Sequence, residues 1–176
     1  RYGLMLREDG MVMDDGTAAR LADDHYVVTT TTANAVGVYR HMEFCRQCLW
    51  PELDVQVIST TEAWAQFSVA GPNARALLAQ VVDQDISDAA FPYMGAGNFT
   101  ACGGLRARLF RISFSGELAY EIAVPTRYGD ALIRKMAGLA ESMGGCVYGT
   151  EALGVMRIEK GHVAGNELNG TTTALN

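Results

Sequence analysis

The sequence predicts an α+β protein with two lobes, each an antiparallel sheet with helices packed on one face. Three observations support this fold class. Apolar runs near the N-terminus are joined by an Asp-Gly turn, a helical apolar stripe spans residues 33–49, and a second series of strand, helix, strands and helix begins at Trp64. We therefore expect one lobe over residues 1–60 and a second over residues 61–176.

The first lobe begins with a β-hairpin. Gly3–Leu6 and Met11–Met13 are apolar runs, and Asp9-Gly10 between them is a typical hairpin turn. Tyr26 is aromatic, and Val27, Val28 and the threonines that follow are β-branched, which predicts a third strand over Tyr26–Val28.

A helix is expected to follow the third strand. Its apolar stripe contains Val38, Met42 and Cys45, and Pro51 ends it. The pattern then returns to a strand over Asp54–Ser59.

The second lobe begins with a strand over Trp64–Val69 and a turn at Gly71-Pro72-Asn73. The helix after this turn has an apolar face made of Ala74, Leu77, Leu78 and Val81. Later helices are predicted around Leu132–Met143, ending at Gly144-Gly145, and from Thr150 onward.

A hairpin in the middle of this lobe carries two carboxylates at its mouth, Glu117 and Glu121. The residues before it read L-R-A-R-L-F-R-I-S-F, and the hydrophobic phase slips between Leu109 and Phe110, so a β-bulge is expected there. A carboxylate beside an aromatic such as Phe114 can bind a flat ligand through paired N–H donors. The alternative is that Glu121 is only the solvent-facing residue of an alternating strand.

Composition excludes several classes of protein. The formal net charge of −6 argues against a general nucleic-acid binder, which needs a basic face. No apolar run is long enough to span a bilayer, and no secretory signal is visible. The sequence also lacks a phosphate-cradling glycine loop, a G-x-G-x-x-G turn and a nucleophile elbow, so it does not support an NTPase or a hydrolase.

The cysteines do not predict a metal site. Cys45 and Cys48 form a single C-x-x-C, which is a weak metal signal, and the apolar stripe favours a core role for Cys45. The three histidines are scattered, and none stands at ligand spacing from a Cys or an Asp. We expect no metal and a reducing compartment.

Two further charged groups have both a functional and a structural interpretation. Asp14-Asp15-Gly16 follows the predicted strand Met11–Met13, and one of two adjacent carboxylates at a strand end could accept a proton from an amine or orient it. Asp-Gly is also common in loops, which favours a plain turn. Arg106, Arg108 and Arg111 could face an anionic substrate, although a solvated strand face is favoured.

Four motifs occur in an order that resembles a known family. They are M-L-R-E-D-G-M-V-M-D-D-G, Y-V-V-T-T-T-T-A-N, F-S-G-E-L-A-Y-E-I and R-I-E-K-G, and together they cover nearly the whole chain. The chain resembles the aminomethyltransferase fold of the glycine-cleavage T-protein. T-T-T-T-A-N and the ending E-A-L-G-V-M-R-I-E-K-G-H are most similar to the folate domain of heterotetrameric sarcosine oxidase α subunits, and next to dimethylglycine oxidases and dehydrogenases.

The resemblance implies a tetrahydrofolate site. Asp15 matches the family's catalytic carboxylate near the folate N10, and Glu121 matches the glutamate that binds the pterin ring. Phe114 stands where the family usually has a stacking tyrosine. Thr31 and Tyr120 complete the implied cofactor-binding residues, Thr31 in place of the T-protein's asparagine.

The implied reaction belongs to the amine-oxidase branch. Leu153 stands where the T-protein has an arginine, which disfavours T-protein activity. We expect transfer of the oxidised methyl carbon of an N-methyl amine, such as sarcosine, to tetrahydrofolate, giving 5,10-methylene-tetrahydrofolate. The alternatives are a glycine-cleavage aminomethyltransferase, a non-catalytic folate-binding or regulatory domain, and a structural docking domain.

The resemblance also implies what surrounds this chain. We interpret it as a cytoplasmic fragment that lacks the start of the first lobe and the family's final β-barrel. Its partners would be the rest of the α subunit and the other sarcosine oxidase subunits, with no nucleic acid and no membrane. FAD, FMN and NAD would bind elsewhere in that complex.

Overall fold

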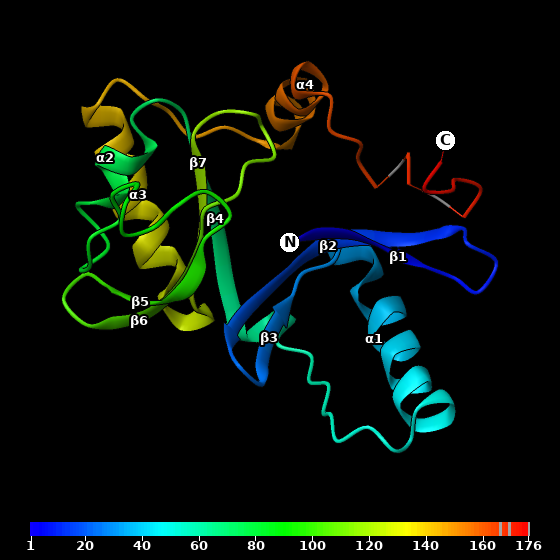
Figure 1. Ribbon diagram of the computed structural model, residues 1–176. Coiled ribbons are helices and arrows are strands. Elements are labelled where there is room, and N and C mark those ends of the chain that lie inside the picture. The colour runs from blue at the N-terminus through cyan, green and yellow to red at the C-terminus, as the bar shows by residue number, and fades with distance from the viewer. Residues whose placement is uncertain (166, 169, 176) are drawn as a thin grey trace. The chain divides into compact units, whose positions relative to one another are not determined.

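The computed structural model describes residues 1–165, 167–168 and 170–175 (Figure 1). The chain divides into two compact units, which are described separately. Unit 1 contains residues 1–19, 24–61 and 163–176, and unit 2 contains residues 20–23 and 62–162. The α+β class with antiparallel sheets is confirmed. Residues 163–176, which the sequence analysis grouped with the second lobe, belong to unit 1.

The sheet of unit 1 has the strand order β1-β2-β3. β1 (Tyr2–Leu6) and β2 (Val12–Ala22) form the expected antiparallel hairpin, and β3 (His25–Val28) is the expected third strand. The prediction that the second strand ends near Met13 is wrong. β2 continues to Ala22, so the Asp-Asp-Gly sequence lies inside a strand and not in a turn.

The helix predicted over residues 33–49 has three parts. A 3₁₀ turn, η1 (Thr32–Asn34), leads into α1 (Ala35–Phe44), and a π-helical turn, η2 (Cys45–Leu49), ends it. Val38 is buried as expected, and Cys45 is half-buried. The strand predicted over Asp54–Ser59 is absent, because this segment has no partner strand among the described residues and is almost entirely exposed.

Unit 2 contains an antiparallel sheet in the order β4-β7-β6-β5. The strands are β4 (Trp64–Ala70), β5 (Ala96–Ala101), β6 (Leu105–Phe110) and β7 (Ala119–Pro125). The helices are α2 (Ala74–Leu78), α3 (Gly129–Ser142) and α4 (Thr150–Lys160), close to their predicted positions. η3 (Thr61–Ala63) and η4 (Thr126–Tyr128) are short 3₁₀ turns.

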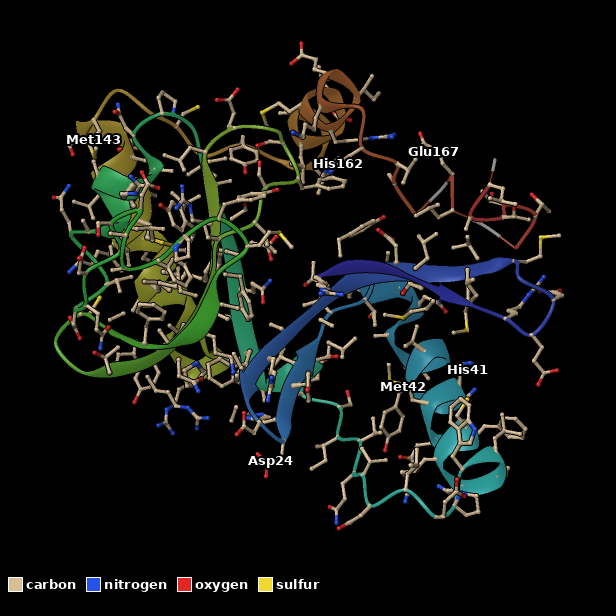
Figure 2. The ribbon with its side chains drawn as sticks, in the orientation of Figure 1. Asp24, His41, Met42, Met143, His162 and Glu167 are labelled. Atoms are coloured by element: carbon tan, nitrogen blue, oxygen red, sulfur yellow. The ribbon has the colours of Figure 1, made fainter. Side chains whose placement is uncertain are left out.

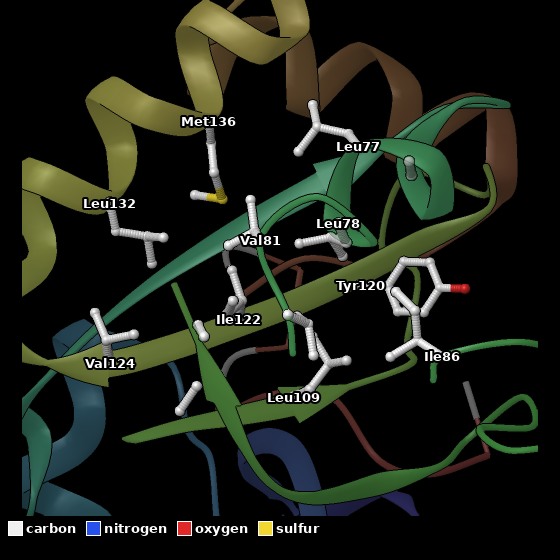
Figure 3. Close-up of a cluster of buried hydrophobic side chains, with 14 of the residues drawn as sticks. Leu77, Leu78, Val81, Ile86, Leu109, Tyr120, Ile122, Val124, Leu132 and Met136 are labelled. Atoms are coloured by element: carbon white, nitrogen blue, oxygen red, sulfur yellow. The ribbon is translucent and has the colours of Figure 1, made fainter. Parts of the chain in front are cut away.

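The core of unit 2 lies on one face of this sheet. Ile122 and Val124 of β7 face Leu132 and Met136 of α3, and Tyr120 lies farther along β7 in the same buried cluster (Figure 3). Each of these five side chains is at most 4% exposed, and burial of a side chain of this size contributes about 1.5–3 kcal/mol. The alternate residues of β7, including Glu121, therefore lie on the opposite face.

The β-bulge predicted near Leu109 is absent. The β6–β7 register runs without a shift through Arg108↔Ala123, Leu109↔Ile122 and Phe110↔Glu121. The hydrophobic phase slips for a different reason: residues 107–110 are all buried, on both faces, so the strand need not alternate.

Candidate functional site

The two adjacent aspartates of β2 have different surroundings. Successive strand side chains point to opposite faces, so the carboxylates of Asp14 and Asp15 lie on opposite faces of β2. Asp14 is 3% exposed, and its Oδ2 accepts a 3.1 Å hydrogen bond from the backbone N–H of Thr31. Asp15 is half-buried, and its Oδ2 accepts a 2.9 Å hydrogen bond from the hydroxyl of Tyr2. Asp15 is thus the more accessible of the two.

Gly16 allows the backbone of β2 to lie very close to the backbone of Thr29. A Cβ atom at this position would lie 1.9 Å from the carbonyl oxygen of Thr29. The N–H of Thr29 also donates to the Thr17 carbonyl at 2.8 Å, and the N–H of Thr17 donates to the Thr29 hydroxyl at 2.9 Å. This close approach fixes the start of the segment that brings the Thr31 amide to Asp14.

Thr31, expected among the cofactor-binding residues, lies in unit 1 with Asp15. Its backbone amide is used by Asp14, while its side-chain hydroxyl has no hydrogen bond among the described residues. Nearby, the side-chain amide of Asn34 donates to the carbonyl of Met13 at 2.7 Å. The structure therefore assigns a clear structural role to the amide of Thr31 and leaves its hydroxyl available.

Glu121 lies in unit 2, on the sheet face opposite the core. Its neighbours across the strands are Ser68 on β4 and Phe110 on β6. The side-chain amide of Gln66 donates a hydrogen bond to Oε2 of Glu121. Burial raises the pKa of Glu121 above its usual value, and the Gln66 bond lowers it by less. Glu121 is therefore not a fully solvated strand residue.

Phe114 lies in the loop that joins β6 to β7, close to the end of α4. Its ring is 36% exposed, and its centroid is 5.5 Å from that of His162 (labelled in Figure 2). Gly116 has φ of +91°, and a Cβ there would meet the side chain of Lys160 at 2.9 Å. Two motifs distant in sequence, F-S-G-E-L-A-Y-E-I and R-I-E-K-G, therefore pack together within unit 2.

Tyr120 does not share a face with Glu121. Its side chain is fully buried in the core, and its hydroxyl accepts a 2.8 Å hydrogen bond from Nε of Arg75 (Figure 3). Its ring is stacked with that of Phe91. This placement gives Tyr120 a structural role in the core, and its part in cofactor binding stays a prediction.

The arginines of the β6 segment also differ from the favoured interpretation. Arg108 is 7% exposed and lies 4.0 Å from the centroid of the Trp64 ring, with Arg106 5.3 Å from the same centroid. Arg111 forms a 2.6 Å ion pair with Asp88. A solvated strand face is thus wrong for Arg108 and Arg111, and Arg106 alone of the three is exposed.

A cavity of about 530 Å³ lies in unit 2, between β4, α3 and the segment that leads to α4. Most of its lining is apolar and includes Phe67, Met136 and Leu153, the residue that stands in place of the T-protein arginine. Gln66 and Ser68 also line it, although Glu121 does not. An apolar residue at position 153 therefore suits its surroundings, where an unpaired arginine would be costly.

The cysteines offer no clear metal centre. All four are free, and among the described residues no three His, Cys, Asp or Glu side chains gather as a metal site. The expectation that no histidine stands at ligand spacing from a cysteine is wrong. Nε2 of His41 on α1 (Figure 2) lies 3.7 Å from Sγ of Cys45. In the part of the chain that is described, no helix has the length and apolar character to cross a membrane.

Tyr2 and Gln66 were not identified from the sequence. Tyr2 donates a hydrogen bond to the candidate residue Asp15, and Gln66 donates one to the candidate residue Glu121. Each reaches its carboxylate from a neighbouring strand, at a position two residues away from the directly opposed one. Both belong to alternating strand segments, but only the register between strands identifies their partners.

Comparisons with known proteins agree with this architecture. The family of the GCVT N-terminal domain matches residues 1–176. The chain is 56% identical over 172 residues to sarcosine oxidase subunit alpha of Rhizobium meliloti, covering 97% of this chain and 17% of that protein. It is 28% identical to an aminomethyltransferase of Streptomyces coelicolor, covering 98% of this chain and 45% of that protein.

A solved structure shows the same fold. The glycine cleavage system aminomethyltransferase T from Bartonella henselae superposes with a TM-score of 0.79 at 25% identity, over 98% of this chain and 44% of that one. The chain thus spans about a sixth of its sarcosine oxidase relatives and under half of the aminomethyltransferases. Because the family match covers every residue, the chain belongs to the family of the GCVT N-terminal domain.

Proposed function

We propose that this chain is a tetrahydrofolate-binding domain of an enzyme that oxidises N-methyl amines such as sarcosine. In this proposal the domain transfers the oxidised methyl carbon to tetrahydrofolate and forms 5,10-methylene-tetrahydrofolate. The observation that carries the proposal is Glu121, a half-buried carboxylate on the face of the unit 2 sheet opposite its core. The relatives named sarcosine oxidase subunit alpha support the choice of amine.

The donors and acceptors present fit a reduced pterin. A pterin presents a ring N–H beside an exocyclic amine, and a carboxylate can accept both. Oε2 of Glu121 already accepts from Gln66, and its Oε1 has no partner among the described residues. Phe114, which is partly exposed, offers a ring face for stacking.

Asp15 is assigned to the chemistry. Condensation of a formaldehyde-level carbon with the two folate amines forms two C–N bonds and releases one water, so both amine protons must leave. A carboxylate within hydrogen-bonding reach of an amine can orient it and accept its proton. The hydroxyl of Tyr2 occupies one lone pair of Oδ2 and so fixes the orientation of the Asp15 carboxylate. Thr31 is retained as a cofactor-binding residue through its side-chain hydroxyl.

The rest of the enzyme is proposed by analogy with the relatives. FAD, FMN and NAD would bind elsewhere in the parent complex, and the partners would be the rest of the α subunit and the other subunits. A cytoplasmic location, without membrane or nucleic-acid partners, completes the proposal. The second candidate is a glycine-cleavage aminomethyltransferase, which the relatives of that name favour. Leu153, which lines an apolar cavity, argues against it.

The test is calorimetric titration of tetrahydrofolate into the complete parent protein and its Glu121→Gln variant. The substitution keeps the shape but removes the charge and one acceptor, so affinity should fall by about 1.5–3 kcal/mol, as for a hydrogen bond to a charged group. An unchanged dissociation constant would sink the pterin assignment of Glu121. Absence of folate binding by the parent protein would favour the structural docking role instead.

A further inference from the structure

Gln66 and Glu121 form a diagonal pair across two neighbouring strands. In the β4–β7 register, Ser68 lies opposite Glu121 and Gln66 lies opposite Ala123. Gln66 and Glu121 therefore share one sheet face, and the small side chain of Ala123 leaves room between them. Nε2 of Gln66 donates its hydrogen bond to Oε2 of Glu121 across this space.

This bond makes the two carboxylate oxygens of Glu121 unequal. Oε2 is held by Gln66, whereas Oε1 accepts no hydrogen bond from any described residue. A carboxylate tethered at one oxygen loses less rotational freedom when a ligand binds the other oxygen. The tether also reduces the number of rotamers that the half-buried Glu121 side chain can adopt.

We infer that Gln66 is a positioning residue for the folate site: it fixes Oε2 of Glu121 through one lone pair and leaves Oε1 and the second lone pair of Oε2 to the ligand. The inference rests on the proposed function, because it gives Gln66 a role in the same site. Gln66 touches the carboxylate and not the reacting atoms, so its effect passes through Glu121.

The charged state of Glu121 also depends on this bond. Burial raises the pKa of the Glu121 carboxyl, and the Gln66 bond opposes that rise by stabilising the ionised form. Among the described residues, the strand register places Arg106 and Arg108 of β6 on this face, and Tyr148 contacts β4 there. Both arginines lie over the Trp64 ring, and the Tyr148 hydroxyl donates to Ser68 at 3.2 Å, so none bonds to Glu121.

The sign of the pH effect follows from these contributions. Loss of the Gln66 amide leaves burial unopposed, so the pKa of Glu121 rises further. Because the proposed binding needs the ionised carboxylate, folate affinity should then fall at the acidic end of the pH range and recover at the alkaline end. A bond that merely joined β4 to β7 would change affinity equally at every pH, or not at all.

The experiment uses the complete parent protein and its Gln66→Met variant, since methionine keeps the length without the donor. The Glu121 carboxyl is titrated by ¹³C NMR, and the tetrahydrofolate dissociation constant is measured from pH 5 to pH 9. The control is Gln47→Met, because Gln47 also donates to a glutamate, Glu43, within unit 1. We expect the carboxyl pKa to rise in Gln66→Met, with up to about tenfold weaker folate binding at pH values below it, and no change in either quantity in the Gln47→Met control.

A second variant, Gln66→Glu, strengthens the test. Two carboxylates in contact cannot both ionise easily, so this variant should raise the pKa more and weaken folate binding further at neutral pH. An unchanged carboxyl pKa in Gln66→Met, a shift without any change in folate binding, or an equal loss of affinity at every pH would each overturn the inference. Failure of the proposed function looks different, because Glu121→Gln itself would then bind folate as tightly as the parent.

Discussion

The hydroxyl of Tyr2 donates a 2.9 Å hydrogen bond to Oδ2 of Asp15 across the β1–β2 hairpin. In the hairpin register, Leu4 and not Tyr2 lies opposite Asp15, so the tyrosine reaches its partner diagonally. Partial burial, then the bond to Asp15 and its charge, raise the pKa of Tyr2 to about 12. Tyr2 therefore keeps its proton at physiological pH and remains a donor to the proposed catalytic carboxylate.

The Tyr2–Asp15 bond predicts an alkaline signature. In Asp15→Asn the charge that holds the phenol proton is gone, so the pKa of Tyr2 should fall toward its usual value of 10. Ultraviolet titration of the tyrosines, with Tyr2→Phe identifying the signal, measures this change. Because the folded pKa of Tyr2 is raised, the free energy of unfolding falls as pH rises from about 10 to about 12. In Tyr2→Phe, the free energy of unfolding should fall less steeply over this pH range. If the free energy of unfolding fell equally steeply with pH in the parent and in Tyr2→Phe, the predicted Tyr2–Asp15 bond would be contradicted.

Asp15→Asn should separate chemistry from binding in the complete parent protein. The amide keeps the shape, so folate should still bind, but formation of methylene-tetrahydrofolate should fall by about 10²–10⁴-fold, as is usual for a general acid–base group. Amine oxidation should continue and release free formaldehyde. Asp23→Asn is the matched control, because the Asp23 side chain is fully exposed. Product formation at the normal rate would make Asp15 a structural residue.

Glu121→Gln should stabilise the folded protein at neutral pH. Because burial raises the folded pKa of Glu121, the native state binds a proton more readily than the unfolded state, and stability is lost as pH rises through that folded pKa. Glutamine has no such charge to bury. The free energy of unfolding, measured by urea denaturation, should therefore favour the variant at pH 7 and match the parent at pH 3. A variant less stable than the parent at pH 7 would show that the ionised carboxylate is favourably held.

Gly16→Ala should destabilise the protein strongly. The new Cβ would meet the carbonyl oxygen of Thr29 at 1.9 Å, and neither strand backbone can move away without breaking the Thr17–Thr29 bonds. We expect a loss of at least about 2 kcal/mol, within the range for overpacked sites, in urea denaturation. Gly138→Ala in α3 is the control: no atom lies within 4 Å of its Cβ, so it should stabilise by about 0.4–1 kcal/mol.

Leu153 should separate the two branches of the family. Leu153 cannot supply the charge of the T-protein arginine, so a partner that needs this charge should not bind productively. The parent protein should therefore not release ammonia from an aminomethylated lipoyl carrier in the presence of tetrahydrofolate. It should instead convert the methyl carbon of sarcosine to methylene-tetrahydrofolate, with reduction of flavin. Ammonia release at a rate typical of a glycine-cleavage enzyme would reverse this assignment.

Much of the fold could be predicted from local pattern. The β1–β2 hairpin follows from Asp9-Gly10 between apolar runs, and α3 follows from apolar residues at helical spacing. Strand pattern failed over Asp54–Ser59, because a strand needs a partner that the pattern does not reveal. It also failed between Leu109 and Phe110, where burial on both faces imitates a bulge.

The sequence by itself determined the fold class, the order of most elements and the motifs that carry Asp15 and Glu121. Only the tertiary structure decided what those carboxylates contact. The register between strands brings Tyr2 to Asp15 and Gln66 to Glu121. The side chain of Tyr120, on the other face of β7, is buried in the core. The physical reason is that a strand's side chains alternate with a period of two, while their partners come from other strands whose offset is set by turns and packing.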